Sequence, residues 1–160
     1  MKGSIFPENI IPVEAIAPAT DSAGKTGDYL CLKNLAQVFV VVHITQGAAN
    51  TSAITIEQAT DVAGTGSTAI TKVVPIWANQ DCAASDTLTR QTDAVSFTTS
   101  AAVKHKIVIF KIDPALLATS SGFDCITVKT GASSASNIVA AQYLCVSKYA
   151  QDTPPTVITD

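Results

Sequence analysis

The sequence predicts an all-β domain, a two-sheet β-sandwich of jelly-roll-like type. The 160 residues include 24 Ala, 20 Thr, 15 Val and 15 Ile but only 7 Leu and 3 Glu, a composition that suits pleated strands better than helices. Alternating segments recur about eight times at intervals of roughly a dozen residues, and no βα alternation interrupts them. The halves also echo each other weakly. The order VFVVVHITQG, ITIEQAT, VVPIWANQD returns as IVIFKIDP, ITVKTGA, AQYLCVSKYAQD, as two Greek keys would produce.

The first 28 residues predict an extended arm. Prolines at 7, 12 and 18, with Gly24 and Gly27, break both the helical and the strand period. The arm is nevertheless apolar, so we expect it and the tail from Gln151 onward to contact surfaces outside their own domain. The candidate residues for contacts with a neighbouring subunit or another protein are Ile5, Phe6, Ile10, Ile11, Ile16, Pro154 and Val157.

Regular alternation begins at Tyr29. A short apolar segment leads into residues 36–46, AQVFVVVHITQ, whose two faces are both apolar in the middle and therefore favour a central strand. Residues 53–59, AITIEQA, alternate again. After a Gly-rich loop comes ITKVVPIWA, 70–78, where Pro75 indicates an edge strand or a bulge.

The second half starts with a polar, Thr-rich stretch that predicts two short strands, TLTR and AVSFT. A clear strand returns at 104–113, KHKIVIFKID. Asp113 and Pro114 then form an N-cap and N1 pair for one short helix, which Gly122 ends. The last strands lie within 123–130 and 137–150. We therefore divide the chain into an arm (1–28), a sandwich domain (29–150) and a tail (151–160).

Period-2 spacing also predicts which side chains fill the core. The predicted core residues are Val38, Val40, Val42, Ile44, Ile54, Ile56, Ile107, Ile109, Ile126, Val128, Ile138 and Leu144.

The cysteines predict neither a metal site nor a disulfide framework. Cys31, Cys82, Cys125 and Cys145 contain no CxxC pair and no Cys–His cluster, so we expect four reduced thiols and no zinc. Cys125 and Cys145 should be buried as small apolar residues, and Cys82 should be the most exposed.

No motif predicts catalysis or a cofactor. GTGSTA at 64–69 superficially matches a dinucleotide-binding turn, but it leads into a strand where that motif needs a helix. His43 and His105 are too few for a metal ligand set. A net charge of −3 with a single arginine disfavours a nucleic-acid partner. No apolar run is long enough for a membrane span or a signal peptide, so we expect a protein made and kept in the cytoplasm.

Over nearly its whole length the chain resembles small proteins encoded in the head-assembly region of tailed bacteriophages and prophages. The resemblance lies in residues 27–49, 55–70, 77–81, 122–135 and the ending YAQDTPPTVITD. It implies a non-enzymatic virion structural protein, a head decoration or cement protein on the capsid surface, assembled in the host bacterial cytoplasm. Its implied partners are the phage major capsid protein and other copies of itself.

Two other functions stay open. Sandwich folds also serve as carbohydrate- or receptor-binding modules. Such modules need exposed aromatic side chains, which Trp77 or Tyr149 could provide. A small hydrolase would need a clustered nucleophile and base, for instance Cys82 with one of the histidines.

Overall fold

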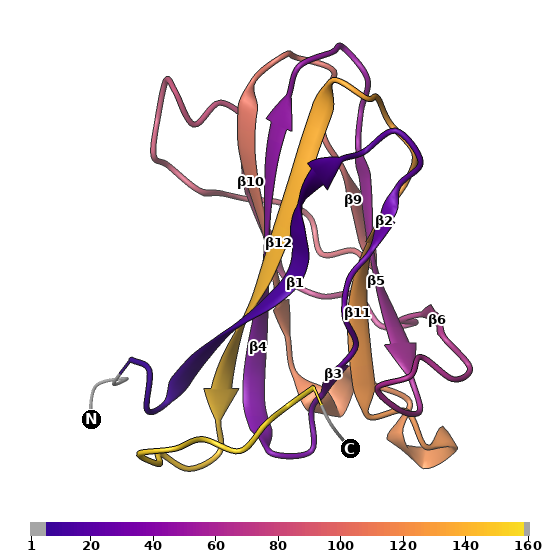
Figure 1. The fold of residues 1–160 in the computed structure, drawn as a ribbon, viewed down its shortest axis with the longest axis vertical. Coiled ribbons are helices and arrows are strands. Elements are labelled where there is room, and N and C mark those ends of the chain that lie inside the picture. Colours follow the sequence, from indigo (N-terminus) through magenta and orange to yellow (C-terminus); the bar gives the residue numbers. More distant parts are fainter. Residues whose placement is uncertain (1–5, 159–160) are drawn as a thin grey trace.

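Two antiparallel sheets face each other in the computed structural model, which describes residues 6–158 (Figure 1). Sheet A runs in the order β1 (Ile10–Thr20), β12 (Asn137–Ser147), β4 (Leu35–Gln46), β10 (His105–Ile112), β7 (Ile76–Asn79), β8 (Thr89–Arg90). Sheet B runs β2 (Lys25–Thr26), β11 (Cys125–Thr130), β5 (Ala53–Ala59), β6 (Thr68–Ala69). The short β3 (Leu30–Cys31) also pairs with β11, and β9 (Ser96–Thr98) pairs with β5.

The strand order is that of a jelly roll, which confirms the predicted fold class. The late strand β12 inserts between the early strands β1 and β4, and β11 inserts between β2 and β5. The echo between the two halves has a structural counterpart. The corresponding segments β4 and β10 pair with each other, as do β5 and β11.

The core lies between the sheets, and the predicted inward residues are right in β4, β5 and β11. Alternate residues of these strands are fully buried, for example Val40, Ile56 and Val128. The predictions for β10 and β12 are wrong by one residue. Ile107, Ile109 and Leu144 are only half-buried and Ile138 is 43% exposed. The buried residues are instead Val108, Phe110, Ile112, Val139, Ala141, Tyr143 and Cys145.

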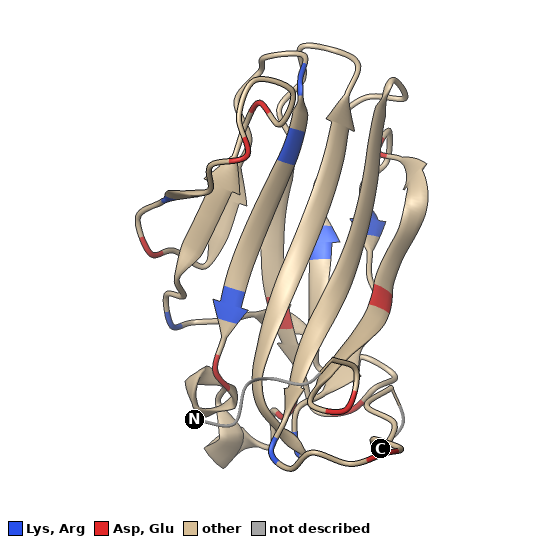
Figure 2. Ribbon diagram, turned by 90° about the vertical axis from the view of Figure 1, so that its left-hand side faces the viewer, with Lys and Arg blue, Asp and Glu red and all other residues tan. Residues whose placement is uncertain are grey.

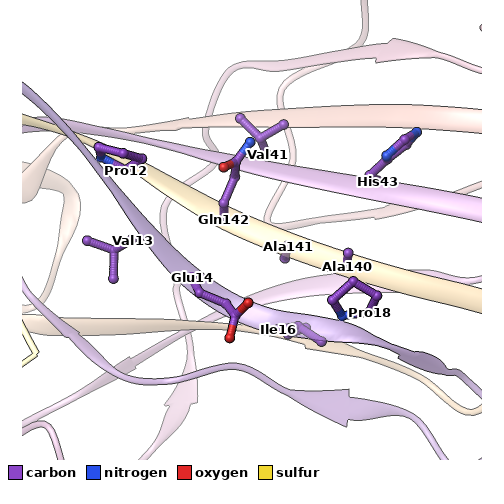
Figure 3. A pocket seen from close by; sticks show the side chains of 10 residues that line it. All are labelled: Pro12, Val13, Glu14, Ile16, Pro18, Val41, His43, Ala140, Ala141 and Gln142. Carbon is purple, nitrogen blue, oxygen red and sulfur yellow. The ribbon is translucent and has the colours of Figure 1, made fainter. Parts of the chain in front are cut away.

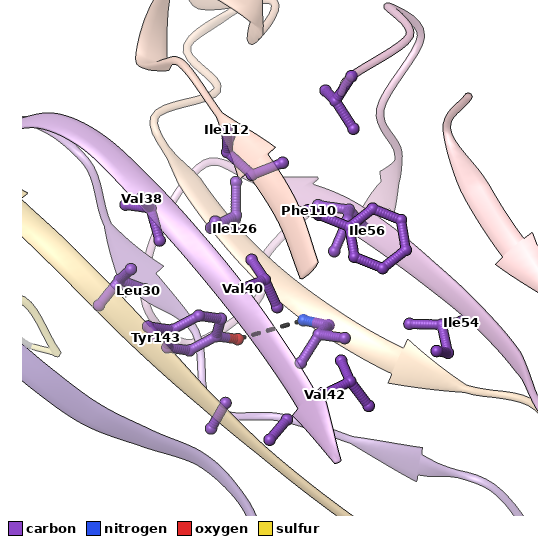
Figure 4. Packing of buried hydrophobic residues seen from close by; sticks show 14 of the residues in the cluster. Leu30, Val38, Val40, Val42, Ile54, Ile56, Phe110, Ile112, Ile126 and Tyr143 are labelled. Atoms are coloured by element: carbon purple, nitrogen blue, oxygen red, sulfur yellow. Dashed lines mark hydrogen bonds between the residues drawn. The ribbon is translucent and has the colours of Figure 1, made fainter. Parts of the chain in front are cut away.

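Tyr143 explains part of the one-residue error in the core prediction for β12. Its side chain points into the core because its hydroxyl bridges the two sheets. The hydroxyl donates to the Asp28 carbonyl (2.9 Å) and accepts from the Val128 amide (3.2 Å), the bond dashed in Figure 4. Burial raises the pKa of this phenol well above its ordinary value. A tyrosine can therefore occupy the centre of the core because both hydrogen-bonding directions of its hydroxyl are used.

Part of the predicted arm is a strand of the sandwich. Residues 10–20 form β1 at the edge of sheet A, where Pro12 and Pro18 are tolerated because an edge strand leaves some of its N–H positions unpaired. Irregularities in the pairing between Glu14 and Ile16, and again after Ile16, turn Ala15 and Ile16 into the core. This segment therefore lies along its own domain.

The end of the described chain also returns to the domain. Val157 is buried, and its carbonyl accepts the Cys31 amide at 2.7 Å. The Gln151 amide donates to the Glu8 carbonyl at 3.3 Å, so the two ends of the described chain meet.

The predicted short helix is two separate 3₁₀ turns, Pro114–Leu116 and Thr119–Ser121. Asp113 caps the first turn as expected, accepting the Ala115 amide at 2.9 Å. Leu117 then adopts an extended conformation and turns into the core, which prevents one continuous helix. Gly122 ends the second turn with φ 84°, the left-handed conformation that favours glycine.

Candidate functional site

The outer face of sheet A is the most distinctive surface of the molecule. Because strand pairing sets which side chains lie next to one another, the registers define cross-strand rows. One row runs Gln142, Val41, Ile109 and Trp77, and the next runs Ala140, His43 and Ile107. The flanking rows are Pro12, Leu144, Phe39, Lys111 on one side and Ile138, Thr45, His105 on the other. We call these side chains the outer face.

Charge is almost excluded from this face. The strands β4 and β12, 12 and 11 residues long, contain no Lys, Arg, Asp or Glu. Figure 2 looks onto this sheet, and the coloured bands fall on the strands to either side of them. The charged side chains nearest the middle are Glu14 on β1 and Lys111 on β10, at the margins of the face. An apolar centre with a polar margin is the usual composition of a protein–protein contact.

A shallow groove of about 310 Å³ crosses the face beside β1. Val41 of β4 and Gln142 of β12 stand on the same side of the sheet, with His43 further along β4 (Figure 3). Pro12 and Pro18 of β1 form its other wall. The lining combines prolines and apolar side chains with one amide, one imidazole and the Glu14 carboxylate, so it suits an apolar protein segment better than an anionic ligand.

The two aromatic side chains considered as anchors differ in exposure. Trp77 is half-buried, and the Arg90 guanidinium lies over its ring, 4.7 Å from the centroid. Arg90 is held in turn by Asp93 at 2.5 Å. One face of Trp77 is thus occupied, whereas Tyr149 is 76% exposed.

The contact residues predicted from sequence are dispersed by the fold. Phe6 is 62% exposed, and Ile10, Ile11 and Pro154 are half-buried. Ile16 and Val157 pack inside this chain. Ile5 lies outside the described residues. The contact role of the accessible members stays a prediction.

Sequence reasoning missed the outer face because it assigned four of its members to the core. Ile107, Ile109, Ile138 and Leu144 alternate as regularly as the residues that are truly buried. The signal that could have found the face is the apolar character of both sides of β4, β10 and β12, which exceeds what one core can bury.

Sequence reasoning also missed a buried lysine. Lys106 follows the inward phase of β10, and its ammonium donates to Gln46 Oε1 (2.8 Å), the Ser100 carbonyl (2.6 Å) and Ser100 Oγ (3.1 Å). Burial lowers the pKa of this lysine. Because every group around the ammonium is a neutral acceptor, the arrangement ties β4 and β10 to the loop before β10.

The fold brings together Cys82 and His105, the nucleophile and one of the bases considered for a hydrolase, because the Cys82 amide donates to the His105 carbonyl at 2.9 Å. Their side chains, however, contact other groups. The Cys82 thiol contacts the Asn79 carbonyl at 3.9 Å, and His105 Nδ1 lies 3.2 Å from Thr45 Oγ1. Among the described residues no disulfide forms, so all four cysteines are thiols that are not disulfide-bonded. Cys31, Cys125 and Cys145 are buried and Cys82 is half-buried, the order of exposure predicted.

Glu57 takes part in an ion pair on sheet B. It accepts from Ser67 Oγ at 2.5 Å and from Lys129 Nζ at 2.7 Å. Burial alone would raise the pKa of this carboxyl, but these two donors outweigh burial and lower it. The pair stabilises the alignment of β5 with β11 and does not contribute to the outer face.

Comparison with known proteins adds similarities at low identity. No family model and no curated protein matches the sequence. Among solved structures, the chain is similar to the SPBc2 prophage-derived protein YomS, with 12% identity, a TM-score of 0.42, and coverage of 84% of this chain and 95% of that one. It is also similar to a chain of the cowpea mosaic virus top component, a naturally occurring empty particle, with 11% identity, a TM-score of 0.31 and coverage of 91% and 93%. Among residues 6–158, no helix is long and apolar enough to cross a membrane.

Proposed function

We propose that this chain is a non-enzymatic structural protein of a tailed-phage virion, a head decoration or cement protein that binds and stabilises the capsid shell. The observation that carries the proposal is the outer face of sheet A. Its interior strands offer Phe39, Val41, Leu144 and their neighbours without a charged side chain among them. A surface of this kind needs a protein partner to cover it.

The size of the face fits a stable contact. The five strands contain 46 residues. At roughly 3.3 Å per residue along a strand and roughly 4.8 Å between strands, the face offers on the order of 700 Å². A standard interface takes about 800 Å² from each partner. The resemblance to phage head proteins supplies the partner class, the major capsid protein, and the site of action, the capsid surface of the virion.

A second candidate is a carbohydrate- or receptor-binding module, favoured by Tyr149. This ring borders a hollow of about 290 Å³ that Asn34, Lys148 and Gln151 also line. An exposed aromatic beside amide groups could stack on a sugar ring. This function would leave the outer face unused, so one set of variants separates the two candidates.

The test is co-sedimentation of the purified protein with capsids of the phage whose genome encodes it. Ile138 and His43 are exposed members of the outer face, so a double variant Ile138→Asp, His43→Asp changes the surface with little cost to folding. The matched control is Val73→Asp, because Val73 is a 56% exposed β-branched residue that is not part of the outer face. We expect the double variant to lose at least tenfold in capsid affinity and the control to bind as the wild type does.

Failure of the wild-type protein to bind capsids would exclude the decoration function. If the double variant binds capsids as tightly as the wild type, the outer face is not the contact surface. Loss of glycan-array binding in Tyr149→Ala, with no capsid binding by any variant, would support the second candidate.

A further inference from the structure

Two cysteines that are 94 positions apart in the sequence face each other on sheet B. Cys31 of β3 lies directly opposite Cys125 of β11. The Cys31 amide points away from β11, to the Val157 carbonyl at 2.7 Å, while the next residue, Leu32, donates to the Asp124 carbonyl at 2.8 Å. Cys31 and Cys125 therefore form a non-hydrogen-bonded pair, the position in an antiparallel ladder where opposite side chains lie closest.

A carboxylate completes this cluster. Asp124 Oδ1 lies 3.2 Å from Cys125 Sγ, and the two sulfurs and a carboxylate oxygen all lie within 4.8 Å of one another. The other carboxylate oxygen, Oδ2, lies 3.3 Å from Lys33 Nζ. One oxygen of Asp124 is thus directed at the thiols and the other at a lysine.

We propose that Cys31, Asp124 and Cys125 bind a divalent thiophilic cation of the zinc type. Two thiolates and one carboxylate are a ligand set that zinc accepts in tetrahedral geometry, with the fourth position left to water. Zinc–sulfur bonds of about 2.3 Å place tetrahedral ligands roughly 3.5–3.8 Å apart, so the cluster must contract by up to about 1 Å. Side-chain rotation can supply this movement, because the two strands already hold the Cβ atoms opposite each other.

The surroundings resemble those of a metal site. Ala59, Tyr29 and Val62 pack around the two cysteines and form an apolar shell. Lys33 holds the outer oxygen of Asp124, as hydrogen-bond donors commonly hold a ligating carboxylate. The Asp124 side chain is 28% exposed, which gives a cation a path from solvent. Spacing along the chain could not predict this cluster, because the strand pairing alone brings the ligands together.

A bound cation would fix three segments at one point. It would join β3 to β11 and, through the Cys31 amide, to the chain end at Val157. The site is on sheet B and does not depend on the proposed capsid function.

The test is titration of the reduced protein with Co²⁺ in the absence of air and chelators. We expect one equivalent to produce the thiolate-to-cobalt charge-transfer band and the intense visible bands of a tetrahedral site, and Zn²⁺ to abolish both. Cys31→Ser and Cys125→Ser should each remove the charge-transfer intensity. Cys82→Ser is the matched control and should keep the full spectrum, since Cys82 lies outside the cluster.

If a buried cysteine variant does not fold, Asp124→Asn still tests the proposed site. This partly exposed side chain should tolerate the change, and zinc affinity measured by competition with a coloured chelator should fall roughly 10- to 100-fold. Absence of the cobalt spectrum in the reduced wild-type protein would overturn the proposal. So would an unchanged spectrum in Cys31→Ser, or an affinity that Asp124→Asn leaves intact.

Discussion

Tyr143 shows how a single polar atom fixes the packing of a residue. Replacing it with Phe keeps the ring but leaves the Val128 amide and the Asp28 carbonyl without the hydroxyl that joins them. We expect the free energy of unfolding to fall by about 1–3 kcal/mol, the cost of leaving buried groups unsatisfied. Urea unfolding measures the change. Tyr149→Phe is the control, and its exposed hydroxyl should change stability by less than about 0.5 kcal/mol.

Cys145 should make the protein less stable in alkali. Burial raises the pKa of its thiol from 9.0 to about 12. Above pH 9 the thiol therefore ionises in the unfolded chain but stays protonated in the folded one, so stability is lost as pH rises from 9 towards 12. The loss attributable to this group is about 1.4 kcal/mol at pH 10.

Urea unfolding at pH 8 and pH 10 tests this expectation through a difference. The wild type should lose about 1.4 kcal/mol more between the two pH values than Cys145→Ala does. Cys82→Ala retains Cys145 and should behave as the wild type. Equal losses in wild type and Cys145→Ala would contradict the prediction.

Residues could be assigned correctly to the core from the sequence only where one face of a strand was clearly more polar than the other. In β5, Thr55 and Glu57 mark the outward side, so Ile54 and Ile56 could be assigned to the core. In β10 the two lysines lie on opposite faces, Lys111 on the outer side and Lys106 on the inner side, so lysines did not mark which face is outward. Lys106 shares the inward phase with Val108 and Phe110, and a lysine at such a position argues for the solvent side. Its burial is possible because acceptors are supplied by Gln46, 60 positions away in the sequence, and by Ser100, 6 positions before it.

At the scale of elements, β1 is the clearest departure from expectation. The prolines of residues 10–20 argued against a central strand, and the segment is instead an edge strand, a position that accommodates them. The segment is part of the sandwich, so removing residues 1–20 would expose one side of β12 and delete two core residues, Ala15 and Ile16. Such a deletion therefore cannot test capsid contacts without also affecting folding.

A point substitution measures the contribution of β1. Ile16→Ala should lower the free energy of unfolding by about 2–4 kcal/mol, because it leaves a cavity in the core. Ile10→Ala, at a half-buried position of the same strand, should cost less than half as much. Similar small effects at both positions would mean that β1 does not hold Ile16 in the core in solution.

The remaining elements were predictable where local chemistry decides the structure. Asp113, Pro114 and Gly122 mark the ends of the 3₁₀ region correctly, because capping and positive φ are properties of single residues. The number of turns was not predictable, since the burial of Leu117 against the core interrupts the helix. The very short β2, β3 and β6 exist only through their partners in sheet B.

At the scale of the whole molecule, the order of strands determines how folding must proceed. Both sheets depend on pairing early strands with late ones, as β1 pairs with β12 and β2 with β11. Topologies dominated by non-local pairs fold in milliseconds to seconds, as a rule. We expect the main refolding phase after stopped-flow dilution from urea to fall in that range, and a main phase in microseconds would contradict the pairing described.

The fold class followed from composition and alternation, but the candidate sites did not. Identifying the outer face required the registers of five strands, and identifying the Cys31–Cys125 pair required the pairing of β3 with β11. Local spacing does not show which residues pair, although the apolar character of both sides of β4, β10 and β12 does signal an apolar outer surface. Both become visible only when strands distant in sequence are paired.

The prolines of β1 also restrict how copies of this molecule can associate. The unpaired N–H and C=O groups of an edge strand can pair with a strand of another copy, and repeated pairing of this kind produces open-ended aggregates. Pro12 and Pro18 delete two donors from that row, and the irregular pairing around Ile16 bends it. Growth by adding strands is therefore discouraged at this edge. At this edge, contacts between copies are therefore left to side chains and not to added strands.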